Sequence, residues 1–280
     1  ISPHFWQDKR VLLTGQTGFK GAWMSLWLHS MGAKVQGFAL APPTTPNLFE
    51  EAKVDNLIQS NLGDIRDFAA VAKVVKNFKP EIVFHMAAQP LVRYSYDAPI
   101  ETYATNVMGT VNLLESLRDC PSVKSVLIIT TDKCYENREW VWGYREDEPM
   151  GGFDPYSSSK ACSELVTAAY RQSFHDKAGI AVATARAGNV IGGGDWSKDR
   201  LIPDTVKALS DNQEIVIRNP KSIRPWQHVI EPLFGYLELG LKLNTNPVKY
   251  SQAYNFGPNT SDALSVEEMV VRSINSWEFG

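Results

Sequence analysis

Short apolar runs alternate with amphipathic stretches through the first two-thirds of the chain. In the amphipathic stretches apolar residues recur three or four positions apart, the spacing of one helix face. We expect strands at residues 11–13, 34–40, 57–62, 81–86, 125–131 and 180–187. We expect helices at residues 19–31, 67–78 and 100–117, and a further helix that opens at Asp154-Pro155. Near-continuous apolar strands between helices predict an α/β fold with a parallel, doubly wound sheet.

The alternation loosens after Asn189. The glycine triplet at residues 192–194 precedes a predicted short helix from Pro203 and a predicted strand at residues 215–217. We therefore expect two parts, a sheet domain over residues 1–187 and a smaller, mixed C-terminal region over residues 188–280 that caps it.

Composition narrows the class of protein. Of the 280 residues, 44% are hydrophobic and 21% are charged, proportions typical of a soluble globular protein. The net charge of -3 argues against a surface for nucleic acid or anionic membranes, and no apolar stretch is long enough to span a bilayer. The first ten residues carry charges and a proline, unlike a signal peptide. Cys120, Cys134 and Cys162 predict free thiols in a reducing cytoplasm, and the scattered histidines predict no metal site.

A glycine-rich loop joins the first predicted strand to the first predicted helix. In this loop Gly15 permits a tight turn, Gly18 lets the backbone approach a pyrophosphate, and Gly21 lets the helix pack closely on the strand. The start of the helix then offers free N–H groups to phosphates. The spacing predicts a Rossmann domain that binds a dinucleotide, with Thr17, Phe19 and Lys20 as further cofactor contacts; the alternative is an ordinary strand-to-helix turn.

The identity of the dinucleotide is less firmly indicated. Residues 38–42, at the end of the second predicted strand, contain no acid to bind the ribose hydroxyls. No Arg replaces that acid, so we favour NAD, while its affinity and the preference over NADP stay open. Asp64 and Ile65 follow the third strand and are candidate contacts of the adenine; the alternative role of Asp64 is a helix cap.

The predicted helix after Pro155 carries a Tyr-Lys pair. Residues four apart share a helix face, so Tyr156 and Lys160 can point into one cleft. Free Tyr has a pKa of about 10, so a basic role near neutrality requires about three units of lowering, roughly 4 kcal/mol. A neighbouring ammonium and a cationic nicotinamide can supply this stabilisation. The alternative is a solvent-exposed Tyr and Lys without a catalytic role.

These motifs together resemble the extended short-chain dehydrogenase/reductase family. His85-Met-Ala-Ala-Gln89, Asn106 and Arg186-Ala-Gly-Asn-Val190 extend the resemblance over essentially the whole chain. The resemblance implies that Ala87, Ala88, Gln89 and Asn106 lie along the cofactor, that Thr131 binds a sugar hydroxyl beside Tyr156, and that Asn189 contacts sugar-nucleotide phosphates. It also implies a homodimer or a dimer of dimers, built on a helix pair that includes the Tyr156 helix.

Thr131-Asp132-Lys133 resembles the nucleotide-sugar 4,6-dehydratases within that family. These enzymes oxidise C4, eliminate water across C5 and C6, and return the hydride to C6, which implies NAD that is regenerated. The resemblance implies that Asp132 is the acid at the C6 hydroxyl, a role that requires a raised pKa. Lys133 stands where many dehydratases have a Glu that acts as the C5 base, so the base stays open; Lys133 could be that base or could stabilise the enolate. The alternative is an exposed charged pair in a loop.

Three segments narrow the substrate. Residues 131–135, 139–145 and 218–228 resemble the branch that acts on CDP-glucose. Arg218 and Arg224 offer guanidinium groups to a pyrophosphate. Asn189, Arg200 and His228 complete the implied substrate-binding set, which makes residues 188–280 mainly a substrate-binding region.

Two rival functions remain. A nucleotide-sugar 4-epimerase shares the fold, the cofactor, Tyr156 and Lys160, but has no use for Asp132-Lys133. A non-catalytic NAD(P)-binding regulator needs neither Tyr156 nor Lys160. Members of the family usually continue past residue 280, and the chain begins at Ile1 rather than Met, so we expect sequence beyond both ends.

Overall fold

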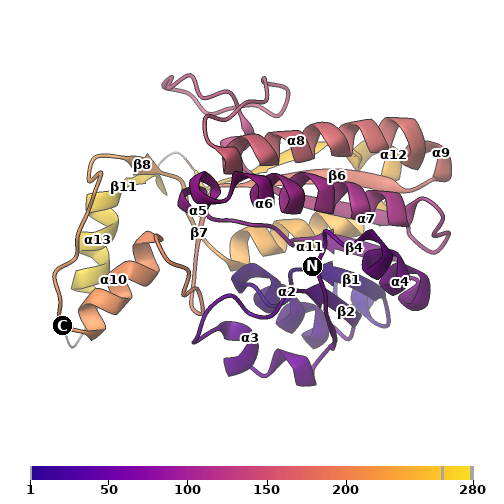
Figure 1. Cartoon of the computed structure of the whole chain (residues 1–280), viewed down its shortest axis with the longest axis horizontal. Helices are drawn as coiled ribbons and strands as arrows, with labels where there is room; N and C mark the ends of the chain where they lie inside the picture. The colour runs from indigo at the N-terminus through magenta and orange to yellow at the C-terminus, as the bar shows by residue number, and fades with distance from the viewer. Residues whose placement is uncertain (1, 260–261, 278–280) are drawn as a thin grey trace.

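A seven-stranded parallel sheet forms the centre of the computed structural model, which describes residues 2–259 and 262–277 (Figure 1). The strand order is β10-β6-β5-β4-β1-β2-β3, and each neighbouring pair is parallel. The strands are β1 (Arg10–Thr14), β2 (Lys34–Ala39), β3 (Gln59–Leu62), β4 (Ile82–His85), β5 (Ser125–Thr131), β6 (Ala181–Ala187) and β10 (Ala253–Phe256). The order reverses between β1 and β4, which confirms the predicted doubly wound α/β fold.

Helices cover both faces of this sheet. Successive strand residues point to opposite faces, so Val11 and Leu13 pack with one layer and Leu12 with the other. The first layer contains α2 (Phe19–Ser30) and α11 (Ile230–Thr245). The second contains α4 (Phe68–Phe78), α7 (Gly109–Leu117) and α8 (Pro155–Tyr170) (Figure 1). Both faces of the inner strands β1, β4, β5 and β6 are therefore buried, which explains their almost continuous apolar sequence, while the edge strand β3 is polar and largely exposed.

The predicted helix at residues 100–117 is divided into three pieces. α6 (Pro99–Tyr103) and α7 flank a π-helical turn, η2 (Ala104–Met108). Such turns are rare and often accompany functional sites. A second π-helical turn, η4 (Arg171–His175), follows α8 and leads into α9 (Asp176–Ala178). The remaining short elements of this part are α1 (Pro3–Trp6), α3 (Leu48–Glu51), η1 (Val54–Asn56), α5 (Val92–Asp97) and the 3₁₀ turn η3 (Asp132–Cys134).

The chain after residue 187 contributes to both parts of the molecule. α10 (Leu201–Ser210), α13 (Val266–Asn275) and the antiparallel pair of β8 (Ile223–Arg224) and β11 (Leu264–Ser265) form a small body at one side (Figure 1). α11 and β10 instead return to the large sheet, with α12 (Pro247–Tyr250) between them. β7 (Asn189–Ile191) and β9 (Trp226–His228) pair in parallel between the two parts. The predicted division between residues 187 and 188 does not separate two bodies in space, because the chain after residue 187 contributes to the large sheet as well as to the small body. That residues 188–280 mainly bind substrate stays a prediction.

The predicted strand at residues 215–217 is wrong. These residues belong to no strand and instead line a cleft. A run of three apolar residues satisfies a strand pattern, but a strand also needs a partner with free backbone groups, which a local pattern does not show.

Candidate active site

The glycine loop lies at the carboxyl ends of β1 and β4, where the strand order reverses. Gly15 has a φ of +81°, and a Cβ there would lie 2.7 Å from the backbone nitrogen of Ala87. A Cβ on Gly21 would lie 2.0 Å from the Gly15 carbonyl oxygen, so helix α2 packs directly on the turn. Thr17 donates a hydrogen bond to the Leu40 carbonyl at 2.8 Å and ties the loop to the end of β2. This backbone cradle at the start of a helix fits a dinucleotide pyrophosphate.

Buried hydrogen bonds from Asn106 hold the segment that follows β4. The Asn106 side chain accepts a hydrogen bond from the Gln89 backbone nitrogen at 2.8 Å and donates to the Gln89 carbonyl at 3.1 Å. It also donates to Ser159 of α8 at 2.9 Å. The π-helical turn thus aims one amide at two separate elements. In this structure Asn106 positions the Ala87–Gln89 loop and the helix that carries Tyr156.

His85 ends β4 beneath this loop. Its ring contacts the Thr14 hydroxyl at 2.7 Å and the Thr110 hydroxyl at 3.2 Å. Burial, with a smaller contribution from the Lys160 charge, lowers the pKa of His85 to about 3. The imidazole is therefore neutral at physiological pH and serves as a hydrogen-bonding link in the floor of the site.

The predicted adenine contacts lie at the end of β3. The Asp64 carboxylate binds the Arg66 guanidinium, with a shortest distance of 2.5 Å, and this contact lowers the pKa of Asp64. Ile65 is 5% exposed, and a Cβ on Gly109 would lie 2.7 Å from its side chain. The side chain of Ile65 is thus part of the core, so any cofactor contact at this position would involve its backbone.

Helix α8 brings Tyr156 and Lys160 beneath the cleft. Asp154 caps the helix by accepting a hydrogen bond from the Ser157 nitrogen at 2.9 Å. Burial raises the pKa of Tyr156, while the Lys133 charge and a hydrogen bond with Thr131 act in the opposite direction. Lys160 donates to the Ile129 carbonyl at 3.1 Å, and burial lowers its pKa to about 8. Thr131 and Tyr156 both line the cleft, and the binding of a sugar hydroxyl by Thr131 beside Tyr156 stays a prediction from the family resemblance.

The turn after β5 carries the predicted acid and its lysine. Thr131 donates to Asp132 Oδ1 at 3.1 Å, and Lys133 Nζ lies 3.2 Å from the same oxygen. The two charged side chains are 35% and 39% exposed, so water reaches both. A Cβ on Gly188 would lie 3.0 Å from Asp132 Oδ2, which shows how closely the next segment approaches the carboxylate. Asp132 and Lys133 form one ion-paired unit.

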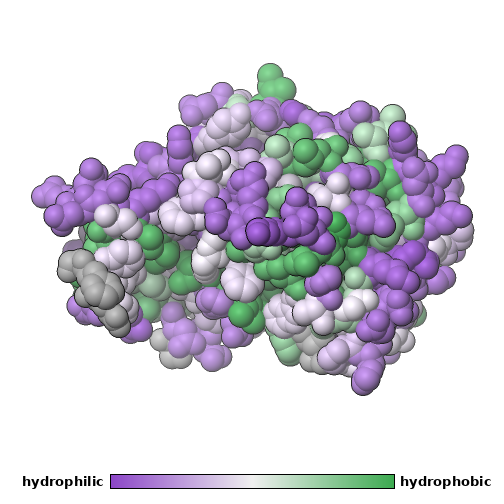
Figure 2. Space-filling model, turned by 90° about the horizontal axis from the view of Figure 1, so that it is seen from below, coloured by the Kyte–Doolittle hydropathy of each residue, from purple (hydrophilic) through white to green (hydrophobic). Residues whose placement is uncertain are grey.

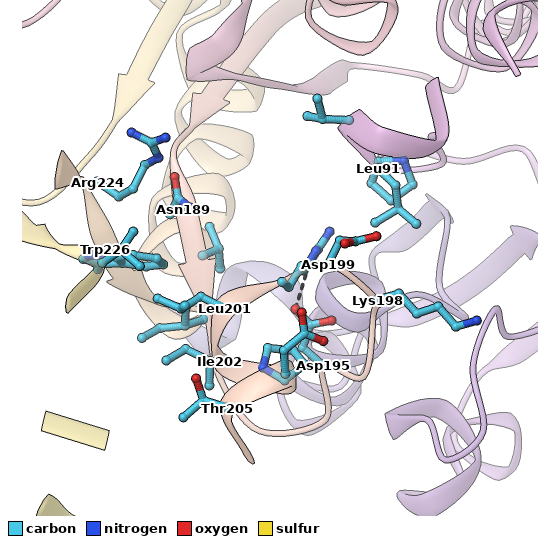
Figure 3. A pocket seen from close by; sticks show the side chains of 18 of the residues that line it. Leu91, Asn189, Asp195, Lys198, Asp199, Leu201, Ile202, Thr205, Arg224 and Trp226 are labelled. Atoms are coloured by element: carbon cyan, nitrogen blue, oxygen red, sulfur yellow. Dashed lines mark hydrogen bonds and ion pairs between the residues drawn. The ribbon is translucent and has the colours of Figure 1, made fainter. Parts of the chain in front are cut away.

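A cleft of about 780 Å³ joins these groups to the C-terminal region. In Figure 3, Asn189, Arg224 and Trp226 lie on one side of it and Leu91 on the other. Figure 2 shows apolar surface where the small C-terminal body adjoins the rest of the molecule. The predicted site residues that line the cleft are Phe19, Lys20, Thr131, Lys133, Tyr156, Asn189, Arg200, Arg218 and Arg224. Among the described residues, three that are predicted as catalytic or substrate-binding lie outside this lining: Asp132, Lys160 and His228. His228 accepts a hydrogen bond from the Ile230 nitrogen at 3.4 Å.

Cations outnumber carboxylates in the cleft wall, and two carboxylates pair with three of its arginines. Arg200 binds Asp195 at 2.8 Å. Asp199 binds Arg93 of α5 at 2.9 Å and Arg218 at 3.1 Å, and thereby bridges the cleft mouth. Burial and the charges of Lys160 and Arg200 lower the pKa of Lys20 to about 7. The wall is suited to a polyanion such as a sugar-nucleotide pyrophosphate.

Several residues of the site were not predicted from the sequence. The Arg93–Asp199 contact joins residues more than a hundred positions apart. A buried ion pair of Glu164 and Arg186 lies under the Thr131 turn. A helix-face argument could have found Glu164, which lies four residues after Lys160. Its partners on β5 and β6 depend on the sheet order.

Two further features concern metals and membranes. Across residues 2–259 and 262–277, no three His, Cys, Asp or Glu side chains are grouped so as to hold a metal ion. No helix of that described part is both long and apolar enough to cross a bilayer.

Comparison of the sequence with known proteins identifies the family of this chain. Residues 12–238 match the family model described as GDP-mannose 4,6 dehydratase. The CDP-glucose 4,6-dehydratase of Salmonella typhimurium is 58% identical over 99% of this chain and 79% of its own length. The dTDP-glucose 4,6-dehydratase of Xanthomonas campestris is 31% identical over 94% of this chain and 74% of its own.

Solved structures share the architecture. A dTDP-glucose 4,6-dehydratase from Streptomyces venezuelae, crystallised with NAD bound, has a TM-score of 0.82 at 25% identity and covers 95% of this chain and 80% of its own. The UDP-glucose 4-epimerase of Thermotoga maritima has a TM-score of 0.81 at 20% identity, with 96% and 83% covered. The second likeness shows the fold alone, since dehydratases and epimerases share it.

Proposed function

Because this chain belongs to the GDP-mannose 4,6-dehydratase family, we propose that it converts CDP-D-glucose to CDP-4-keto-6-deoxy-D-glucose with NAD as cofactor. The observation that carries the reaction type is that Tyr156, Thr131 and Lys133 line one cleft, with Asp132 ion-paired to Lys133 beside it. The choice of CDP-glucose rests on the Salmonella relative. We also propose that the enzyme is cytoplasmic.

The chain offers residues for each part of NAD. The glycine loop from Gly15 to Gly21, with Thr17, Phe19 and Lys20, would hold the pyrophosphate, and Asp64 and Ile65 the adenine end. The segment Ala87-Ala88-Gln89, backed by Asn106, would lie along the nicotinamide end. When bound, NAD would accept a hydride from C4 of the sugar and give it back at C6. Tyr156 and Lys160 would contact the nicotinamide ribose and the reacting hydroxyl.

Tyr156 would take the proton of the sugar 4-hydroxyl. Thr131 lines the same cleft and would bind the same hydroxyl. Because burial raises the pKa of Tyr156, nearby positive charge has to favour the phenolate, and the Lys133 ammonium acts in that direction. Loss of the O–H proton to Tyr156 accompanies loss of hydride from C4, which leaves a C4 ketone.

The ion-paired turn is placed for the elimination. The ketone acidifies the C5 hydrogen; its removal forms the C5–C6 double bond while the C6–O bond breaks. Asp132 would deliver the proton with which the C6 hydroxyl leaves as water. Two roles fit Lys133, which lines the cleft: base at C5, or cation that stabilises the enolate. A proton then returns to C5 when C6 is reduced, so the sugar has lost one water.

The arginines of the cleft wall would bind the nucleotide. Arg200, Arg218 and Arg224 line the cleft beside Asn189 and can neutralise the pyrophosphate. His228 lies at the end of β9, next to this wall.

An exposed apolar helix face supports a proposal for the assembly. Ile100, Tyr103, Met108 and Leu165, on α6, η2 and α8, are 86%, 39%, 51% and 60% exposed. These helices lie beside one another in Figure 1. An apolar face of this kind is commonly buried against another protein. It therefore supports a homodimer, or a dimer of dimers that contains the same contact.

Turnover tests the proposal directly. Purified protein with NAD is given CDP-glucose and, separately, UDP-, dTDP- and GDP-sugars. We expect the ultraviolet absorbance that a 4-keto-6-deoxy sugar develops in base with CDP-glucose alone. Binding of NAD without this signal for any sugar would contradict the dehydratase and favour an epimerase.

A further inference from the structure

The inner side of α8 carries a carboxylate that the proposed chemistry does not use. Glu164 lies one turn after Lys160, and its side chain is 5% exposed. One oxygen accepts a hydrogen bond from the Thr130 hydroxyl. The other accepts from the Thr184 hydroxyl at 2.7 Å and from Arg186 Nη2 at 2.8 Å. Three donors from two strands therefore converge on this one buried carboxylate.

Arg186 extends this contact toward the surface. Its other terminal nitrogen donates to the Tyr135 hydroxyl at 2.6 Å and to the Glu146 carbonyl at 2.9 Å. The Tyr135 hydroxyl in turn donates to Asn255 of β10 at 2.6 Å. The hydrogen bonds to Glu164 and Tyr135 raise the pKa of Arg186 against the effect of burial. The guanidinium is charged and links α8 and β6 to the segment after η3.

The position of these contacts is informative. Thr130 immediately precedes Thr131, and Tyr135 immediately follows η3. The same ion pair thus holds the chain on both sides of the turn that carries Asp132 and Lys133. Buried ion pairs often stabilise a fold no better than apolar residues of similar volume, so stability alone does not account for this one.

The Glu164 charge also acts on Lys160. Burial lowers the pKa of Lys160, and Glu164 is the largest influence in the opposite direction, followed by Cys134 of η3. The ring of His85 on β4, neutral near pH 7, and Lys20 at the start of α2, whose pKa is about 7, also interact electrostatically with Lys160. Glu164 therefore supplies the negative charge that balances Lys160 inside the protein.

We propose that Glu164 is a positioning residue of this enzyme, which with Arg186 fixes the Thr131-Asp132-Lys133 turn against Tyr156 and provides the counter-charge of Lys160. The inference rests on the proposed dehydratase function, because the conversion of CDP-glucose is the reaction by which the variants are compared. It adds to the site a buried group that touches neither substrate nor cofactor.

Glu164→Gln is the first test, because it keeps the size of the side chain and removes the charge. With CDP-glucose and NAD, we expect kcat to fall about 10²-fold, the loss that a misplacement of roughly 1 Å causes, with KM little changed. The alkaline limb of the kcat profile should move to lower pH, since the pKa of Lys160 falls further. Thr184→Val is the matched control: it removes one hydrogen bond to Glu164 but keeps the charge and the link to Thr130. Its kcat and pH profile should match those of the wild type.

A double variant separates positioning from stability. Glu164→Met with Arg186→Met replaces the ion pair by apolar side chains, so neither member of the pair is left buried without the other. We expect a melting temperature near that of the wild type, together with the low kcat and shifted alkaline limb of Glu164→Gln. Wild-type kcat and pH profile in this variant would overturn the proposal.

Two further outcomes are covered. If neither variant folds, Thr130→Val removes only the link between Glu164 and β5, and a wild-type kcat there would overturn the positioning role. Wild-type protein that binds NAD but does not turn over CDP-glucose would refute the proposed function instead. An active wild type with equally active Glu164 variants would refute this inference alone.

Discussion

At the scale of single residues, the opposing influences on Tyr156 decide the chemistry. Burial raises its pKa, and positive charge has to compensate. Tyr156→Phe keeps the ring and removes the group that accepts the proton, so we expect turnover to fall at least 10²- to 10⁴-fold, the usual contribution of acid–base catalysis. The measurement is formation of the 4-keto-6-deoxy sugar from CDP-glucose, followed by its absorbance in base. Retained turnover would remove Tyr156 as the base.

Asp132 has a separable task. Asp132→Asn keeps the shape of the side chain but cannot donate the proton at C6. We expect oxidation at C4 to continue, seen as reduced cofactor that accumulates, while release of the 4-keto-6-deoxy sugar falls about 10²-fold or more. An unchanged rate of dehydration would contradict its role as the acid.

The two roles of Lys133 predict opposite rankings of variants. If Lys133 is the C5 base, Lys133→Glu retains more activity than Lys133→Met, because a carboxylate can also accept the proton. If it acts as a cation, Lys133→Glu is the poorer enzyme. In either case Lys133→Met should move the acid limb of the kcat profile to higher pH, because loss of the charge raises the pKa of Tyr156. Equal kcat and an unmoved limb in both variants would leave Lys133 without a specific role.

At the scale of elements, the sequence predicted what periodicity encodes. The strand that bears Thr131 and the helix that bears Tyr156 and Lys160 were both predicted correctly, since burial and residue spacing leave a pattern in the local sequence. The π-helical turn at residues 104–108 was not, because Asn106 finds its partner Gln89 seventeen residues away. The ion pair of Glu164 and Arg186 was missed for a related reason: only the order of β5 and β6 brings its donors together.

The buried ring at the end of β4 gives a prediction for pH. The pKa of His85 is about 3 in the folded protein against 6.5 ordinarily, so between these values the unfolded chain binds the extra proton. Stability should therefore rise with pH across this window, by up to about 1.4 kcal/mol per unit from this one group. Urea unfolding of wild type and His85→Gln from about pH 4 to 7 measures it. The difference between them should grow with pH, and parallel curves would contradict the buried neutral ring.

At the scale of the whole molecule, the cleft shows where sequence reasoning stops. Seven residues predicted as catalytic or substrate-binding do line it, because their strands end at one edge of the sheet or their segments cross above it: Thr131, Lys133, Tyr156, Asn189, Arg200, Arg218 and Arg224. The return of α11 and β10 to the large sheet was not foreseen. A chain that leaves a domain and re-enters it has no local signature, since each piece has an ordinary amphipathic or apolar pattern.

The exposed face of α6 and α8 gives the last prediction, for the assembly. Leu165→Arg places a charge in an apolar surface that we propose to be covered by a second copy, and desolvation of that charge opposes association. We expect the dimer to dissociate to monomers, measured as mass by light scattering during gel filtration. Leu62→Arg is the matched control, because Leu62 is similarly exposed, 66% against 60%, but lies on β3 at the opposite edge of the sheet. Its mass should equal that of the wild type. An unchanged mass for Leu165→Arg would place the subunit contact elsewhere.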